Sequence, residues 1–445
     1  MGARRRIRAA LVVAVAALGL PVACVPAQPA PCEGFTPKRL PEFIFGSADT
    51  DIDPAYIRTA ATIGYRWVRI PIRWSHLQPS LSTPPAPLTR QQVRNQPGIV
   101  DEFASRVDWS IPDRTLSLTS ELGLKVIGFV GASSAPSVSG VELDPVSLGT
   151  ESYLAYQELV ARAVVRRYGP ARVGAPAATS TIGVWQTENE LNQAAQTALG
   201  GNRRPTGVDG FLNSPWASFD FQTDLLRSLR RGVVTEDPSA VTIVNPLVAS
   251  DASDIFDTIF GRPGWNDVVR SWRNLADVIG FDSYPNTYLP TPVDGAEVGR
   301  VARRIRELAC PGQQVLVMET GYPVAPVARG FTPERQAEFY RQAWAAARDA
   351  GVDGFMPFAS IARYDPEPVY TDVDQRNLDA FGRAYQTGDV GTVIDLYLNQ
   401  TDWVTNKLPT FTGAPGPYLG VMRPDGTPLP ALDVVREIGR ETAGR

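Results

Sequence analysis

Two stretches of the chain, residues 184–192 (VWQTENELN) and residues 315–323 (VLVMETGYP), each run from apolar residues into a glutamate. An apolar strand that ends in a carboxylate places that group at the strand's carboxyl end, where a barrel of parallel strands builds its site. The two glutamates, Glu190 and Glu319, lie 129 residues apart (319 − 190 = 129). That spacing accommodates three strand-plus-helix units, which predicts that the glutamates end the fourth and seventh strands of a barrel.

Short apolar runs alternate with amphipathic stretches through most of the chain. We predict strands at residues 43–47, 65–71, 124–130, 181–187, 241–246, 278–282, 314–319 and 352–358. We predict helices at residues 54–63, 112–122, 152–168, 219–233, part of 254–275, 298–308 and 333–350. Strands that read as continuous apolar runs, each followed by a helix, are typical of a parallel sheet with a covered outer face. Eight such units predict the α/β class and a (β/α)8 TIM barrel, because no Gly-x-Gly-x-x-Gly turn supports the nucleotide-binding alternative.

Glycines and long insertions refine this prediction. Gly123 and Gly351 stand between a predicted helix and the next strand, where a glycine supplies the left-handed turn that ends a helix. Three stretches exceed a minimal barrel, at residues 78–98, 200–215 and 362–406. All three follow predicted strands, so we expect elaborated loops on the face where barrels carry their sites.

Composition excludes several classes of function. The chain has 445 residues, of which 43% are hydrophobic and 20% charged, an ordinary composition for a globular protein. Its net charge of −4 argues against nucleic acid, since phosphate binding needs a concentrated basic surface. His76 is the single histidine, which disfavours histidine-dependent triads and histidine-rich metal sites. We predict no metal and no cofactor.

The amino terminus reads as an export signal. It carries the arginines Arg4, Arg5, Arg6 and Arg8. Residues 9–20 form an apolar run too short to span a bilayer. We therefore expect residues 1–30 to be a signal peptide and residues 31–445 a single barrel domain, secreted and without a transmembrane span once mature. Two processing routes fit the leader: cleavage at an alanine, and lipidation of Cys24 as an anchor to the cell surface.

Two further cysteines, Cys32 and Cys310, remain whichever route the leader takes. In an oxidising compartment two leftover cysteines most simply pair. Such a disulfide would hold the mature amino terminus beside the strand that carries Glu319. The alternative is a pair of unbonded thiols.

The two glutamate stretches resemble those of the clan of retaining glycoside hydrolases built on (β/α)8 barrels. In that clan an Asn-Glu pair ends the fourth strand and its glutamate is the acid/base, while a glutamate ending the seventh strand is the nucleophile. Asn189-Glu190 and Glu319 match these places. The resemblance implies that Asn189 binds the 2-hydroxyl of the sugar, a contact that strengthens in the transition state.

Further motifs extend the resemblance over most of residues 43–440. Arg69, in WVRIPIRW, matches the arginine of the second strand in the family that contains many cellulases and mannanases. Tyr284, in IGFDSYPN, matches the tyrosine that ends the sixth strand of the clan. The sequence ETGYP, at residues 319–323, is similar to the seventh strand of endo-β-1,3-glucanases and β-1,4-galactanases.

The chemistry of a retaining enzyme assigns a task to each charged residue. One carboxylate must be ionised to attack the anomeric carbon, and the other must be protonated to release the leaving group. Arg69 and Tyr284 are expected to keep Glu319 ionised. Glu188, two residues before Glu190, is expected on the same strand face, where its charge would raise the pKa of Glu190. The alternative for Glu188 is a buried ion pair with Arg69 or at the barrel floor.

Aromatic residues follow several of the predicted strands. Their ring faces can stack on the apolar faces of sugars, and we expect Trp74, Tyr322 and Phe358 to do so. Trp216, Trp265 and Tyr288 occupy similar positions.

The sequence thus predicts a secreted glycosidase that cleaves β-linked oligo- or polysaccharides by double displacement, through a glycosyl-enzyme intermediate. A transglycosylase is an alternative, since it uses the same intermediate. Another alternative is a non-hydrolytic carbohydrate-binding barrel at the cell surface. It is supported by Leu191, where many members of the clan have proline, and by the lack of a tryptophan at the end of the eighth strand (GFMPFAS).

Overall fold

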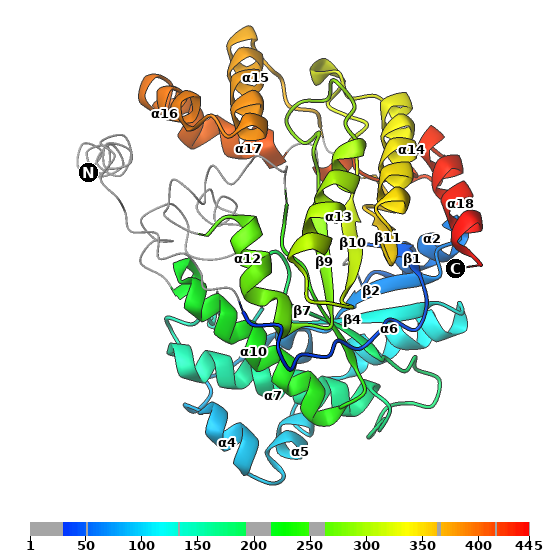
Figure 1. Cartoon of the computed structure of the whole chain (residues 1–445). Coiled ribbons are helices and arrows are strands. Elements are labelled where there is room, and N and C mark those ends of the chain that lie inside the picture. The colour runs from blue at the N-terminus through cyan, green and yellow to red at the C-terminus, as the bar shows by residue number, and fades with distance from the viewer. Residues whose placement is uncertain are drawn as a thin grey trace.

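A closed barrel of eight parallel strands forms the centre of the molecule (Figure 1). The computed structural model describes residues 30–49, 52–131, 134–192, 215–248, 263–362, 366–413 and 416–444. The strands are β1 (Ile44–Ser47), β2 (Trp67–Pro71), β4 (Lys125–Val130), β7 (Val184–Thr187), β8 (Val241–Val244), β9 (Val278–Ser283), β10 (Gln314–Thr320) and β11 (Gly354–Pro357). The predicted (β/α)8 barrel is confirmed, with each strand end within three residues of its expected place.

The strands are apolar on both faces because they pack against two separate cores. One core fills the barrel and contains Ile44, Ile127, Val184, Ile243, Val278, Leu316, Met318 and Met356. The other lies between the strands and the surrounding helices. Strand β1 closes the barrel by pairing with both β2 and β11. Position 354 requires a glycine at this closure, because a Cβ there would come within 2.8 Å of the Ile44 carbonyl oxygen.

Helices follow the strands and cover the barrel. They are α2 (Pro54–Ile63), α6 (Ser110–Glu121), α7 (Thr150–Tyr168), α10 (Phe219–Glu236), α12 (Trp265–Trp272), α13 (Ala296–Leu308), α14 (Pro333–Asp349) and α18 (Pro430–Thr442). Gly123 and Gly351 have positive φ angles of 67° and 72°, so the predicted left-handed turns after α6 and α14 are present. Helix α18 packs against α14 and α2 and completes the ring of helices (Figure 1).

Several small elements were not predicted. They are α3 (Trp74–Leu77), α4 (Arg90–Asn95), α5 (Ile99–Ala104), β3 (Ser80–Leu81), β5 (Ser137–Val138) and β6 (Val141–Glu142), with the short turns η1 (Pro215–Ala217), η2 (Arg273–Leu275), η3 (Val327–Arg329) and η5 (Gly416–Tyr418). Strands β3, β5 and β6 form a separate small sheet. Helix α4 begins with a capping box, in which Thr89 and Gln92 bond each other's backbone N–H groups.

The insertion after β11 forms a helical layer with its own apolar core. It contains α15 (Asp372–Thr387), α16 (Val390–Asn399), the π-helical turn η4 (Trp403–Lys407) and α17 (Leu408–Gly413). The core consists of Leu378, Phe381, Leu396, Trp403, Leu408 and Phe411. Tyr288, which follows β9, packs against this core, so the insertion lies at the carboxyl end of the barrel. Of the predicted insertion at residues 200–215, only residue 215 falls within the described part of the chain.

The amino-terminal segment crosses the opposite end of the barrel. Cys32 and Cys310 form a disulfide with their Cα atoms 5.5 Å apart, and Cys310 lies just before β10. The backbone N–H of Lys38 donates to Asp277, just before β9. The leader and Cys24 lie outside the described residues. No helix in the described ranges is long and apolar enough to cross a membrane.

Candidate active site

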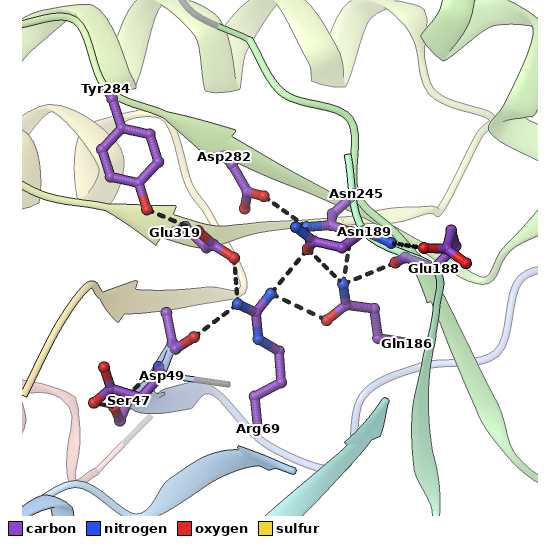
Figure 2. Close-up of polar contacts among 11 residues, drawn as sticks. Ser47, Asp49, Arg69, Gln186, Glu188, Asn189, Asn245, Asp282, Tyr284 and Glu319 are labelled. Atoms are coloured by element: carbon purple, nitrogen blue, oxygen red, sulfur yellow. Dashed lines mark hydrogen bonds and ion pairs between the residues drawn. The ribbon is translucent and has the colours of Figure 1, made fainter. Parts of the chain in front are cut away.

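Polar side chains from four strands meet at the carboxyl end of the barrel (Figure 2). Arg69 comes from β2, Gln186 from β7, Asp282 from β9 and Glu319 from β10. Parallel strands in a closed barrel bring all their carboxyl ends to one rim, so residues far apart in sequence meet there. The structure therefore brings together Arg69, Glu190, Tyr284 and Glu319, as the sequence predicted for a site.

Glu319 is held by two hydrogen-bond donors. The guanidinium of Arg69 donates from Nη2 to Oε1, and the hydroxyl of Tyr284 donates to Oε2 at 2.7 Å. Burial, together with the charge of Glu319, raises the pKa of Tyr284 well above its usual range, so the phenol keeps its proton and remains a donor. The two oxygens of this buried carboxyl group are thus bonded by one cation and one neutral donor.

Arg69 is itself buried and held in place by several acceptors. Its Nη2 donates to the carbonyl of Ala48 at 2.7 Å, and its Nη1 donates at 3.2 Å to both Gln186 and Asn189. Burial by itself would lower the pKa of the Arg69 guanidinium. The negative charges of Glu319 and Asp282 outweigh this effect and raise the pKa. Arg69 therefore presents a fixed positive charge to Glu319.

The backbone after β7 directs Glu190 into the site. Strand β7 ends at Thr187, and both Glu188 and Glu190 have positive φ angles, of 61° and 48°. Non-glycine residues rarely adopt such angles, and they occur most often at functional sites. The N–H of Glu190 donates to the carbonyl of Asn245 at 3.1 Å, which fixes the turn.

The expectation for Glu188 is wrong. Alternation of side chains holds only within a strand, and the two left-handed residues end it here. The Glu188 carboxylate lies beside Gly131, at 2.6 Å from the place a Cβ would occupy, and accepts from the Asn189 N–H at 3.3 Å. Figure 2 shows it turned away from Glu319, and the buried ion pair with Arg69 is formed by Glu319 instead.

Side-chain amides connect the parts of the site. The Oδ1 of Asn189 accepts from Arg69, from Gln186 at 3.0 Å and from Asn245 at 2.9 Å. Asn245 also donates to Asp282 at 2.7 Å. The sequence interpretation missed Gln186 and Asn245, although both are polar residues in or next to an otherwise apolar strand run.

Three carboxyl groups gather at the centre of the site. One oxygen from each of Glu190, Asp282 and Glu319 lies within 4.8 Å of the others. Retaining glycosidases place their two carboxyl groups about 5–5.5 Å apart and inverting ones about 6.5–9.5 Å apart, so Glu190 and Glu319 fall near the shorter separation. Asp282 was missed, although it is a charged residue near the end of the otherwise apolar strand β9, two residues before Tyr284.

The same three residues form a group that has enough ligands for a cation. It is the one such group of at least three histidine, cysteine, aspartate or glutamate residues among those described. Arg69 already places a positive charge against Glu319, and Tyr284 bonds the other oxygen. A second cation at this carboxylate would be repelled by the guanidinium, so the arrangement suits proton transfer better than metal binding.

The structure does not place Trp74 and Tyr322 at the site, which corrects the expectation that they stack on a sugar. Trp74 is 1% exposed and stacks on Tyr156 with ring centroids 4.9 Å apart. Tyr322 is fully buried and donates its hydroxyl to the Pro290 carbonyl at 2.6 Å. Trp216 and Trp265 are buried as well.

Phe358 does lie beside Tyr284, one of the residues of the site. It is half-buried, and its ring meets the Tyr284 ring edge-to-face at 6.2 Å. Tyr288 instead contacts Phe381 and Tyr385 of the helical insertion. Phe358 is therefore the predicted aromatic that remains at the rim of the site.

Comparisons with known proteins agree with this fold. No family model and no curated protein matches the sequence. An exo-β-1,4-mannosidase from Opitutaceae bacterium strain TAV5 matches with a TM-score of 0.52 and 14% identity, over 94% of this chain and 63% of its own. A GH5_18 protein from Streptomyces cattleya, in complex with Manβ1-4GlcNAc, has a TM-score of 0.50 and 17% identity over 90% of this chain and 80% of its own.

A third solved structure, Fpglu1 from fervidobacterium pennivoraus, has a TM-score of 0.55 and 13% identity. It covers 87% of this chain and 83% of its own. The chain spans less than two thirds of the length of the mannosidase, and all three identities are low. These likenesses show that the chain has the (β/α)8-barrel fold of such glycoside hydrolases.

Proposed function

We propose that this protein is a retaining β-glycosidase that cleaves β-linked oligo- or polysaccharides. The observation that carries the proposal is the approach of Glu190 and Glu319, whose carboxyl oxygens lie within 4.8 Å at the carboxyl end of the barrel. That separation leaves room for direct attack on a sugar carbon and little for an intervening water. The ion pair of Glu319 with Arg69 supplies the ionised nucleophile that such attack needs.

The proposed reaction has two steps. In the first, Glu319 bonds to the anomeric carbon while the glycosidic C–O bond breaks, and Glu190 gives its proton to the departing oxygen. In the second, Glu190 takes a proton from water, and the resulting hydroxide displaces Glu319 from the sugar. Asn189, which precedes Glu190 and accepts a hydrogen bond from Arg69, is proposed to bind the sugar 2-hydroxyl, and Phe358 to contact a ring face.

We further propose that the protein is exported. The arginine-rich leader is followed by an apolar run, and the Cys32–Cys310 disulfide is of the kind that persists in oxidising compartments. A lipid anchor at Cys24 remains the alternative to a fully secreted form. Mass spectrometry of the protein from its native membrane and medium fractions separates these two: an acylated Cys24 supports the anchor, and an unmodified cleaved terminus supports secretion.

The activity is tested with the wild type and the Glu319→Gln variant on aryl β-glycosides and on oligomers of β-glucan, galactan, mannan and xylan. We expect turnover by the wild type and almost none by the variant, since the amide is a poor nucleophile. Asp379→Asn is the matched control, because Asp379 is a partly exposed carboxylate on α15 that pairs with Arg329. Binding of a sugar without turnover by the wild type would instead support the carbohydrate-binding barrel.

Stereochemistry tests the mechanism. Proton NMR during the first minutes of hydrolysis identifies the anomer that is released first. We expect the β anomer from a β-glycoside, and the α anomer would contradict double displacement. Addition of an acceptor sugar then measures how much of the intermediate is transferred to sugar and how much to water, which distinguishes a hydrolase from a transglycosylase.

A further inference from the structure

Asp282 is a third carboxyl group at the site with no role in the two-step reaction. It lies near the end of β9 and is fully buried. Its Oδ2 accepts a hydrogen bond from the Asn245 amide at 2.7 Å. Its Oδ1 is also buried, and none of the described residues donates an N–H or O–H to it. One of its oxygens lies within 4.8 Å of an oxygen of Glu190 and of an oxygen of Glu319. Of these two carboxyl groups, Glu190 is the one within side-chain hydrogen-bonding reach.

Charge balance requires a proton in this cluster. Glu190, Asp282 and Glu319 face one cation from the described part of the chain, Arg69, and that cation is bonded to Glu319. Three ionised carboxylates around one guanidinium would leave two negative charges close together in a site sheltered from water. Two carboxyl groups can also hydrogen-bond each other only if one of them carries a proton.

Burial decides which of the two carboxyl groups keeps its proton when the other, as the acid, gives its own away. Asp282 is fully buried, whereas Glu190 is half-exposed and can be solvated when charged. Burial, reinforced by the charges of Glu319 and Glu190, raises the pKa of Asp282 well above its usual range. Environments that push the pKa values of neighbouring carboxyl groups apart assign them different roles.

The other groups that face Asp282 agree with this assignment. Arg69 approaches from β2 and Glu319 from β10, and Tyr284 directly follows the end of β9. Asn245, after β8, is neutral and offers an N–H, which occupies Oδ2 and leaves Oδ1 as the atom for the proton. The pKa of Tyr284 is raised by its own burial, so the phenol adds no charge.

We propose that Asp282 is protonated at neutral pH and donates a hydrogen bond from Oδ1 to Glu190. This proposal rests on the proposed glycosidase function. Asp282 is a positioning residue in it, because it acts on the reaction only through the acid/base, Glu190. When the Glu190 O–H bond breaks and its proton moves to the leaving oxygen, the negative charge that stays on Glu190 accepts the Asp282 hydrogen bond. Glu190 regains a proton from water in the second step, and Asp282 keeps its own throughout.

Asp282→Asn and Asp282→Ala distinguish a protonated from an ionised side chain. Asparagine imitates a protonated carboxyl group: its amide N–H can donate to Glu190, and its oxygen can accept from Asn245. We expect Asp282→Asn to keep kcat/KM within about threefold of the wild type, and Asp282→Ala to lose about tenfold or more.

The pH profiles of kcat/KM show in which direction Asp282 changes the pKa of Glu190. Loss of a neutral donor removes a bond that stabilises ionised Glu190, so the basic limb of kcat/KM should move to higher pH in Asp282→Ala and stay in place in Asp282→Asn. If Asp282 were ionised, both variants would remove a neighbouring negative charge and move the basic limb to lower pH. That result, or equal losses in the two variants, would overturn the proposal.

Infrared spectroscopy tests whether Asp282 carries a proton, and it needs no substrate. Glu190, as the acid, and Asp282 each carry a proton under the proposal, so we expect the wild type at pH 7 to show the carbonyl stretches of two protonated carboxyl groups. Asp282→Asn should remove one of them, and Glu190→Gln should remove the other and retain the Asp282 band. If the Asp282 band is present but no glycoside is cleaved, the glycosidase assignment fails while the proton assignment stands. An Asp282→Asn spectrum that matches the wild type, or a Glu190→Gln spectrum without any protonated carbonyl stretch, would contradict the proposal even if Asp282→Ala does not fold.

Discussion

The two glutamates of the proposed mechanism differ in their immediate surroundings. Glu319 is 7% exposed and is bonded by the Arg69 guanidinium and the Tyr284 hydroxyl. Glu190 is half-exposed and meets two other carboxyl groups, Asp282 and Glu319. One glutamate is therefore bonded by a cation and a neutral donor, whereas the other faces carboxyl groups, and a nucleophile and an acid/base require such different surroundings.

Replacement of Glu190 by glutamine should affect substrates according to their leaving groups. A sugar alcohol leaves poorly without a proton, so kcat/KM for an oligosaccharide should fall by about 10²–10⁴-fold. A dinitrophenyl glycoside needs no protonation, so its kcat/KM should fall far less. The measurement is the ratio of kcat/KM for the two substrates in the wild type and the variant. Equal losses on both substrates would show that Glu190 is not the general acid.

Strand β7 and the insertion after β11 are each held in place by a small number of polar contacts. Strand β7 stops at Thr187, and the turn after it aims Glu190 across the barrel end. The insertion of α15, α16 and α17 is instead organised around Asp374, which is the N3 residue of the α15 capping box. Asp374 accepts from Thr371, from the Trp403 indole at 2.9 Å and from Lys407 at 3.0 Å. One buried carboxylate thus joins the start of α15 to the end of the insertion.

Asp374→Ala should loosen this helical layer. Burial alone would raise the pKa of Asp374, but its hydrogen bonds from Thr371, Lys407 and Trp403 lower it to about 2. A lowered pKa in the folded state means that the group stabilises above the usual aspartate range, and that this contribution is lost as pH falls from about 4 towards 2. We expect lower hydrogen-exchange protection factors in α15 for the variant than for the wild type at pH 7. The difference should shrink near pH 2, where Asp374 of the wild type takes up a proton.

The control for this experiment is Asp372→Ala. Asp372 is an exposed acid in the same first turn of α15. Its removal should change exchange little, because surface substitutions away from such networks shift stability by about 0.5 kcal/mol or less. If both variants loosened α15 equally, the helix dipole rather than the Asp374 network would account for the effect.

At the scale of the whole molecule, the barrel separates the site from the disulfide. The site occupies the carboxyl ends of the strands, whereas Cys32 and Cys310 join just before the amino end of β10. The bridge connects residues 278 positions apart, so it removes much of the freedom of the unfolded chain. Stability and activity are therefore expected to respond separately to its loss.

The double variant Cys32→Ser/Cys310→Ser should lose about 2–5 kcal/mol of unfolding free energy, which is the usual effect of removing a native disulfide. Its kcat/KM at 25 °C should match that of the wild type, because no residue of the site contacts the bridge. Thermal unfolding with and without a reductant measures the first effect, and the double variant should not respond to the reductant. An unchanged melting temperature would contradict a structural role for the bridge.

The linear pattern of residues was enough to predict the barrel and to locate the two glutamates at the ends of its strands. Each strand packs against the barrel interior on one face and the helices on the other, so every strand appears in the sequence as a continuous apolar run. Polar residues at the ends of those runs were therefore recognisable one by one. Glu190 and Glu319 were identified this way, and Arg69 and Tyr284 through the resemblance of their strands to those of a glycoside hydrolase clan. The closed barrel brings all four to one rim.

Only the tertiary structure decided where several neighbouring side chains point. Once a strand ends, the direction of a side chain depends on one or two φ angles, and positive values at Glu188 and Glu190 sent those residues to different places. Trp74 is buried because it finds Tyr156, a partner distant in sequence that no local pattern reveals. Asp282 was not predicted, for the same reason. Its neighbours Glu190 and Glu319 lie far away in the sequence, and only the closure of the barrel brings them next to it.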